Sequence, residues 1–179
     1  MSRSAPSYRF SSTWRVAGTV AEVQAVLSDP GTLTRWWPSV YSAVVPVAEG
    51  RPDGVGRSVR LATQGWLPYT LDWTLTITEP PTERGSALSA VGDLVGAGRW
   101  TFAQDGPEVV IDYDWQVAAT KPVIARLSWL LRPVFAANHE WAMARGEESL
   151  ALELRRRRDP AAAVPPPPGP TFPRLHRPR

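Results

Sequence analysis

Apolar and polar residues alternate along much of the first two thirds of the chain. In Tyr8–Val16 the apolar residues Tyr8, Phe10, Trp14 and Val16 share one face, and in Tyr69–Thr78 every second side chain is apolar, which is typical of strands that bury one face. Pro80-Pro81 is expected to end the second of these strands. Apolar runs between turn-forming residues predict five further strands, which are Tyr41–Val47, Arg57–Trp66, Ser86–Leu94, Arg99–Gln104 and Glu108–Ala118.

Helical periodicity appears after the first strand and again at the end of the domain. Thr19 is followed by Glu22 three residues later, the spacing of a capping box at the start of a helix. A short second helix is expected at Leu33–Trp37. Lys121–Arg158 carries apolar residues at steps of three and four, which predicts one long helix. Pro133 removes one helical hydrogen bond, so a kink or break is expected there.

The order of these elements predicts an α+β domain over residues 7–158. A curved antiparallel sheet of six to seven strands would wrap around the long C-terminal helix, with two short helices after the first strand. A helix gripped in this way leaves a hollow against the sheet, and hollows tend to hold ligands. Residues 159–179 include Pro165–Pro168 and are expected to form a disordered Pro/Arg-rich tail.

Composition places the chain among ordinary globular proteins. Its 179 residues are 43% hydrophobic and 21% charged, which suits one domain and a tail. The absence of cysteine excludes disulfides and thiolate metal sites. No run of about 18 apolar residues suggests a membrane span. No apolar run follows Met1–Pro6, so we expect no signal peptide and a cytoplasmic protein.

The net charge of +3 is unevenly distributed along the chain. Residues 1–154 contain 12 Arg, one Lys and 16 acidic residues, whereas residues 155–179 contain seven Arg and one Asp. The domain is therefore mildly acidic, which argues against a fold that binds nucleic acid through a broad basic face. Arg155–Arg158 could bind an anionic surface, but a solvated helix end is the favoured interpretation.

Four short stretches, together with the order of the elements, carry a family resemblance. They are Trp36-Trp37-Pro38, Leu67-Pro68-Tyr69, Gly92–Gly96 and Asn138–Trp141. Over residues 8–154 the chain resembles the helix-grip fold of the START-like SRPBCC superfamily, in particular its polyketide cyclase-like branch. This superfamily includes polyketide cyclases and dehydrases, lipid and sterol carriers, and plant hormone receptors. The resemblance implies a fold and a cavity but not one chemistry, because the same cavity serves unrelated functions.

Nine tryptophans are many for a chain of this length. An indole has a large apolar body and one N–H group, so it suits a pocket for a flat hydrophobic ligand, although it can equally fill a core. Trp73, Trp100 and Trp115 are the best candidates because their strand neighbours on the same face are apolar. Trp36 and Trp37 would lie near the mouth of the cavity.

His139 is the most interesting titratable residue. It lies on the apolar stripe of the long helix, four residues from both Phe135 and Met143. There it could act as a general acid or base, but a hydrogen-bonded core histidine is the more common arrangement. The other histidine, His176, lies in the tail. A histidine metal site is therefore not expected.

Several other polar residues have weaker claims. Arg132 could reach a ligand carboxylate or phosphate, although a solvated arginine is favoured. Asp112 and Asp114 could pair as acid and base, but the solvated side of a sheet is the more common place for such residues.

Tyrosine and glycine positions complete the set of candidates. Tyr69 and Tyr113 fall on inner faces, where a hydroxyl could orient a ligand carbonyl or satisfy a buried polar group. Gly92, Gly96 and Gly98 lie between two strands, so a hairpin turn is expected there rather than a phosphate loop.

The leading hypothesis is reversible binding of a lipid, an isoprenoid or an aromatic polyketide, with no cofactor. One alternative is a cyclase- or dehydrase-type enzyme in which His139 moves protons, and another is a protein-interaction module with a filled core. The sequence decides neither catalysis nor oligomeric state. The predicted ligand-binding residues are Trp37, Tyr69, Trp73, Trp100, Tyr113, Trp115, Phe135, Asn138 and His139.

Overall fold

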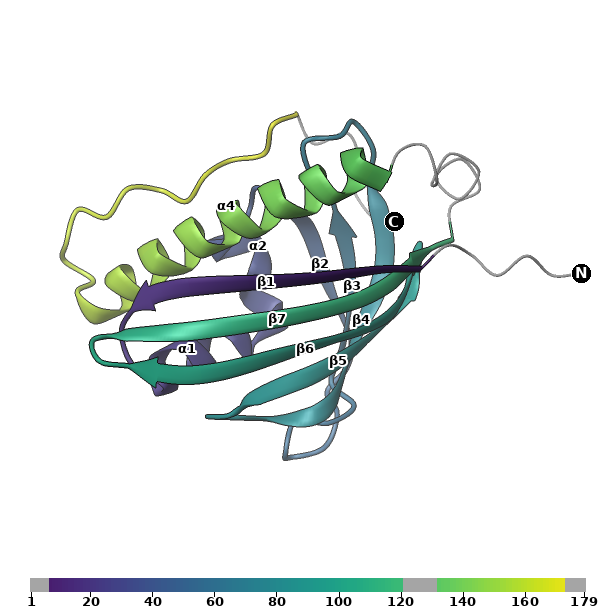
Figure 1. Ribbon diagram of the computed structural model, residues 1–179. Coiled ribbons are helices and arrows are strands. Elements are labelled where there is room, and N and C mark those ends of the chain that lie inside the picture. Colours follow the sequence, from purple (N-terminus) through teal and green to yellow (C-terminus); the bar gives the residue numbers. More distant parts are fainter. Residues whose placement is uncertain (1–6, 121–131, 173–179) are drawn as a thin grey trace, which may run out of the picture.

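A seven-stranded antiparallel sheet and a long helix dominate the computed structural model, which describes residues 7–120 and 132–172 (Figure 1). The strand order is β1-β7-β6-β5-β4-β3-β2, so β2 to β7 form a meander and β1 pairs with the last strand. The predicted helix-grip fold is confirmed. The elements are β1 (Ser7–Ala17), α1 (Val20–Leu27), η1 (Pro30–Thr32), α2 (Leu33–Trp36), β2 (Tyr41–Ala48), β3 (Ser58–Thr63), β4 (Leu71–Thr82), β5 (Gly85–Gly92), β6 (Leu94–Asp105), β7 (Glu108–Ala119) and α4 (Arg132–Arg158).

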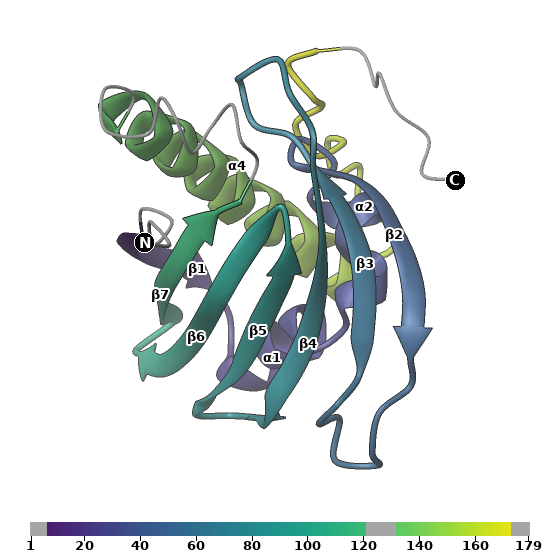
Figure 2. The ribbon, with the colours of Figure 1, turned by 90° about the vertical axis from the view of Figure 1, so that its right-hand side faces the viewer.

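The sheet bends around α4, which crosses its concave side (Figure 2). The short helices α1 and α2 contact α4 on the same side of the sheet. The alternation read from the sequence separates the two faces of the sheet. Trp14 and Ile111 are paired across β1 and β7, and both are fully buried. Their neighbours Thr13 and Asp112 face outward, where the threonine hydroxyl donates to the carboxylate at 2.6 Å.

The capping box predicted at Thr19 is present at the start of α1. The Thr19 hydroxyl accepts from the Glu22 backbone N–H at 3.3 Å, and the Glu22 carboxylate accepts from the Thr19 N–H at 2.8 Å. Arg158, the last residue of α4, donates to the same carboxylate at 2.6 Å. The arginine and the threonine together lower the pKa of Glu22 to about 2. These contacts join the end of α4 to α1.

A buried carboxylate joins α4 to α2. Glu153 is only 2% exposed and accepts from Arg35 at 2.7 Å, and from Arg156 and Arg157 at 2.9 Å each. Burial disfavours the charged carboxylate, but the three guanidinium groups outweigh burial and lower the pKa of Glu153. Three of the four residues in Arg155–Arg158 therefore form ion pairs within the domain, to Glu153 or Glu22.

Replacing Glu153 by Gln is expected to lower the free energy of unfolding by about 1.5 kcal/mol, because the charge-assisted hydrogen bonds become neutral ones. Chemical denaturation of both proteins measures this loss. Glu148→Gln is the matched control, since Glu148 pairs with Arg145 on the exposed side of the same helix. An exposed pair of this kind is worth less than about 1 kcal/mol. Equal losses in the two variants would contradict the role assigned to the buried carboxylate.

The expected end of the central strand was wrong. β4 continues through Pro80-Pro81 to Thr82, where it pairs with Gly85. The pairing with β5 shifts register after Ile77 and again after Glu79. A proline lacks the N–H that a regular ladder requires, but it is tolerated where a bulge interrupts the ladder.

Two predictions near the C-terminus fall partly outside the described residues. The described helix begins at Arg132, so the predicted helical residues 121–131 and the break expected at Pro133 are not tested. Residues 159–172 contain no helix or strand and turn back along α4 (Figures 1 and 2). Arg156 donates to the carbonyl of Pro165 at 3.0 Å. Disorder of the tail remains a prediction. Among the described helices, none has the length and apolar character needed to cross a membrane.

Candidate functional site

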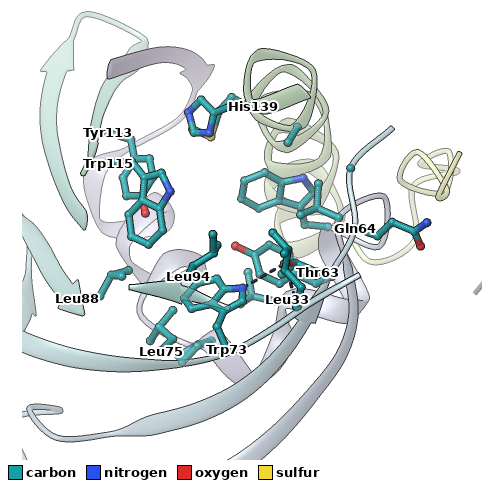
Figure 3. A pocket seen from close by; sticks show the side chains of 18 of the residues that line it. Leu33, Thr63, Gln64, Trp73, Leu75, Leu88, Leu94, Tyr113, Trp115 and His139 are labelled. Carbon is teal, nitrogen blue, oxygen red and sulfur yellow. Dashed lines mark hydrogen bonds between the residues drawn. The ribbon is translucent and has the colours of Figure 1, made fainter. Parts of the chain in front are cut away.

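A cavity of about 170 Å³ lies between the concave face of the sheet, α2 and α4. We call it the inner cavity. Figure 3 shows Trp73 and Leu75 of β4, Trp115 of β7 and His139 of α4 around it. None of the described residues that line it is Asp, Glu, Lys or Arg. A wall of this composition suits an uncharged, largely apolar molecule.

Aromatic rings form a continuous series along one side of the inner cavity. The ring centroids of Trp73 and Trp115 are 5.9 Å apart, and those of Trp115 and Tyr113 are also 5.9 Å apart. Tyr113 in turn stacks on Trp100 at 4.0 Å. Neighbouring rings at such distances attract one another beyond simple burial of area. They hold a flat apolar surface in place without help from a ligand.

Gly98 of β6 makes room for these rings. A Cβ atom at this position would lie 2.5 Å from the Tyr113 hydroxyl and 2.8 Å from the Trp115 ring. Because glycine has no side chain, both rings can lie close to the strand. The sequence predicted a hairpin turn at Gly92, Gly96 and Gly98, and this prediction was wrong for the last two. Gly96 and Gly98 belong to β6, and the turn lies at Gly92-Asp93.

The predicted tryptophans of the cavity differ in how their N–H groups are satisfied. The Trp73 indole donates to the Thr63 hydroxyl at 3.1 Å (Figure 3). Trp37 is only 4% exposed, and its indole N–H has no partner among the described residues. Trp36 is fully buried and also borders the cavity.

A second cavity of about 120 Å³, the outer cavity, adjoins the first where β1 and α4 begin. Tyr8, Phe10, Val117 and Phe135 belong to its wall alone. The predicted contact Phe135 is thus the one member of the predicted set that the structure does not place on the inner cavity. Residues shared by both walls are Tyr69, Leu71, Leu94, Trp115, Asn138 and His139.

His139 lies on the wall between the two cavities. Its ring stacks on Phe10 with a centroid distance of 4.3 Å, and its Nε2 atom is 3.4 Å from the Ser12 hydroxyl. Burial lowers the pKa of His139 to about 4. The imidazole is therefore neutral at pH 7, so it can accept a proton only weakly and has none to donate as an imidazolium.

Asn138 holds part of the cavity wall in place. Its side-chain oxygen accepts from the backbone N–H groups of Trp66 at 2.9 Å and Leu67 at 3.3 Å. These residues belong to the loop 64–70, because β3 ends at Thr63 rather than at Trp66 as the sequence suggested. The same loop carries Tyr69 to the wall shared by the two cavities. Burial raises the pKa of Tyr69 to about 12.

Two of the three weaker candidates, Asp112 and Asp114, border neither cavity, and the third, Arg132, is not tested. Asp112 and Asp114 lie exposed on the outer face of the sheet, as the favoured interpretation expected. Arg132 begins the described part of α4, and its side chain lies outside the described residues. The carboxylate pair therefore has no access to a ligand in the cavity.

Sequence reasoning missed Tyr41, which borders the inner cavity with its ring 5.2 Å from that of Trp37. Tyr41, Val45 and Val47 have the same parity in β2, yet the two valines are exposed. The pairing with β3 shifts register between Tyr41 and Ala43, which explains the change of face. Alternation alone does not reveal such a bulge. The only signal in the sequence that Tyr41 borders the cavity was its position close to Trp36-Trp37, which were expected at the cavity mouth.

The sequence matches a family described as polyketide cyclase / dehydrase and lipid transport, over residues 7–155. The chain belongs to this family. Membership places it in the START-like SRPBCC superfamily, as the sequence resemblance implied. The comparison with curated proteins found no match to the sequence.

Solved structures resemble this family member at low sequence identity. The Zhui aromatase/cyclase from Streptomyces sp. R1128 has a TM-score of 0.69 at 20% identity, covering 89% of this chain and all of the other. A START superfamily protein from Mycobacterium smegmatis gives 0.62 at 17%, covering 83% and 98%. Norcoclaurine synthase from Thalictrum flavum, with dopamine and hydroxybenzaldehyde, gives 0.58 at 15%, covering 83% and 88%. At these identities the likeness establishes the fold alone.

Proposed function

We propose that the protein reversibly binds a hydrophobic small molecule in the inner cavity. The observation that carries this proposal is the cavity wall, which is mainly aromatic and aliphatic and has no Asp, Glu, Lys or Arg among its described residues. Burying a ligand against such a wall is favourable in proportion to the apolar area removed from water. An interaction module would instead fill its core, so the cavity argues against that alternative.

The chemistry of related folds supports a flat ligand, such as an aromatic polyketide, more than a long-chain lipid. One similar structure is named an aromatase/cyclase, and another holds dopamine and hydroxybenzaldehyde. The two cavities, about 170 and 120 Å³, together come close to the lower limit of about 300 Å³ for small-molecule pockets. We therefore expect a ligand of two or three fused rings, bound by a cytoplasmic protein.

Native mass spectrometry of the purified protein, followed by denaturing extraction, tests this proposal. A co-purified apolar molecule that is released only on denaturation would support it and would identify the ligand class. The opposite result is an empty protein whose tryptophan fluorescence does not respond to a panel of lipids and aromatic polyketides. That result would overturn the proposal.

A cyclase- or dehydrase-type enzyme is the second candidate, because His139 lies on the wall of both cavities beside Ser12. With its pKa lowered to about 4, a neutral His139 would serve this chemistry only as a base or a hydrogen-bond partner. If a substrate is found, His139→Phe should abolish its turnover while preserving the stacking on Phe10. Unchanged turnover would exclude this role for His139.

A further inference from the structure

We propose that the hydroxyl groups of Tyr41 and Tyr113 form a donor pair that binds a carbonyl oxygen of an uncharged, flat ligand, such as an aromatic ketone or quinone. This inference rests on the proposed function, because it specifies which ligands the inner cavity prefers. It assigns the recognition to two residues on distant strands, of which the sequence had singled out only Tyr113.

The two tyrosines reach the wall of the inner cavity from opposite parts of the sheet. Tyr41 opens β2, an edge strand, and Tyr113 lies in β7, five strands away in the sheet order. The curvature of the sheet brings both side chains to the inner cavity. Figure 3 shows Tyr113 beside Trp115 on the cavity wall. Burial raises the pKa of Tyr113, and Tyr41 adds a smaller electrostatic contribution in the same direction.

Neither hydroxyl is hydrogen-bonded to a described residue, and neither is among the fully enclosed polar atoms of the described chain, so both remain accessible at the cavity wall. Tyr113 is only 8% exposed, so its polar group is largely removed from bulk water. A buried polar group without a partner is costly, which creates a preference for a ligand that supplies one. Trp73 shows the opposite case in the same cavity, because its N–H is already satisfied by Thr63.

The protonation state of the pair determines which partner it accepts. Burial raises the pKa of Tyr41 and of Tyr113 well above the usual range, so both phenols keep their protons at physiological pH. Each therefore has a proton to donate, and a ligand oxygen with free lone pairs is the complementary group. The indole N–H of Trp37, whose ring packs against Tyr41, is enclosed without a partner among the described residues and supplies no acceptor to this part of the wall.

The rest of the wall excludes other ligand classes. A carboxylate or phosphate would enter a cavity in which no described residue supplies a positive charge, at a large desolvation cost. A pure hydrocarbon would fit the apolar wall but would leave the donors of Tyr41 and Tyr113 unsatisfied. A neutral ring system with a carbonyl group meets both requirements.

The experiment compares 9-fluorenone with fluorene, which have the same ring skeleton and differ in a carbonyl group. Equilibrium dialysis of the full chain measures the dissociation constant of each compound directly. We expect the protein to prefer fluorenone, and Tyr41→Phe or Tyr113→Phe to weaken fluorenone binding about three- to tenfold, as expected for one lost hydrogen bond. Fluorene binding should change by less than about twofold, because neither substitution removes apolar contacts.

Ser42→Ala is the matched control, because it removes the hydroxyl of the residue next to Tyr41, which donates to the Ala62 carbonyl and borders neither cavity. It should leave fluorenone binding unchanged, and thermal unfolding of each variant checks that the fold is intact. If both compounds bind equally well and the two test variants have no selective effect, the donor pair is overturned while the proposed function stands. If neither compound binds and the protein is also empty as isolated, the proposed function itself is overturned.

Discussion

Acidification from pH 7 to pH 4.5 is expected to lower the free energy of unfolding by about 2 kcal/mol through His139 alone. The side chain is packed against Phe10, and burial lowers its pKa from 6.5 to about 4. The unfolded chain therefore binds a proton at this histidine below pH 6.5, while the folded chain resists binding until about pH 4. The contribution of His139 to the free energy of unfolding is fully present above pH 6.5 and is lost as the pH falls from 6.5 towards 4.

Urea denaturation at several pH values, with wild type and His139→Phe, measures this effect. The phenylalanine variant keeps an aromatic ring on Phe10 but has no titratable group, so its stability should stay nearly constant between pH 6.5 and 4.5. Glu22 and Glu153 also have lowered pKa values, but these carboxylates lose their stabilising effect only below about pH 4.5. Curves that change equally with pH in the two proteins would show that His139 is not buried in its neutral form.

The same burial limits the chemistry open to the cavity. The sequence placed His139 on the apolar stripe of the helix and left two roles open, a proton-transferring residue or a core histidine. Stacking on Phe10, contact with Ser12 and a lowered pKa all describe a neutral imidazole held between helix and sheet. A neutral imidazole is sufficient for ligand binding. General-acid catalysis at pH 7 instead requires an imidazolium, which His139 does not form at that pH.

Most of the sheet could be predicted because one of its faces is buried and the other is exposed. The alternation in Tyr8–Val16 corresponds to β1, and the capping box at Thr19 corresponds to the start of α1. Errors arose where the ladder is irregular. β4 passes through Pro80-Pro81 at a bulged pairing, and β6 begins before its glycines. Such irregularities depend on the partner strand, which local sequence patterns do not describe.

The cavity was less predictable than the sheet. Tryptophans on inner faces, such as Trp73 and Trp115, follow from alternation, so the structure brings them together as the pattern suggests. The inward position of Tyr41 could not be predicted from alternation, because a register shift turns it inward while Val45 and Val47 of the same strand face solvent. Hydrogen-bond partners were likewise hidden, since the loop that Asn138 holds is 71 and 72 residues away in sequence.

Gly98→Ala is expected to weaken ligand binding about tenfold or more and to destabilise the protein by about 1–3 kcal/mol. The new methyl group would lie 2.5 Å from the Tyr113 hydroxyl and 2.8 Å from the Trp115 ring. Both rings would have to move away from β6, and the space on that side is the inner cavity. The substitution thus reduces the cavity without adding a polar or charged group.

Dialysis with 9-fluorenone and thermal unfolding measure the two effects of this substitution. Ala97→Val is the matched control, because it enlarges the adjacent residue of the same strand on the exposed face. It should leave both binding and stability nearly unchanged, since substitutions at exposed sites usually stay within about 0.5 kcal/mol. If Gly98→Ala destabilised the protein but preserved binding, the rings would have moved elsewhere, and the ligand would not lie against Tyr113 and Trp115. Such a result would place the ligand nearer to α2, where Trp37 rather than the strand aromatics would form its main contact.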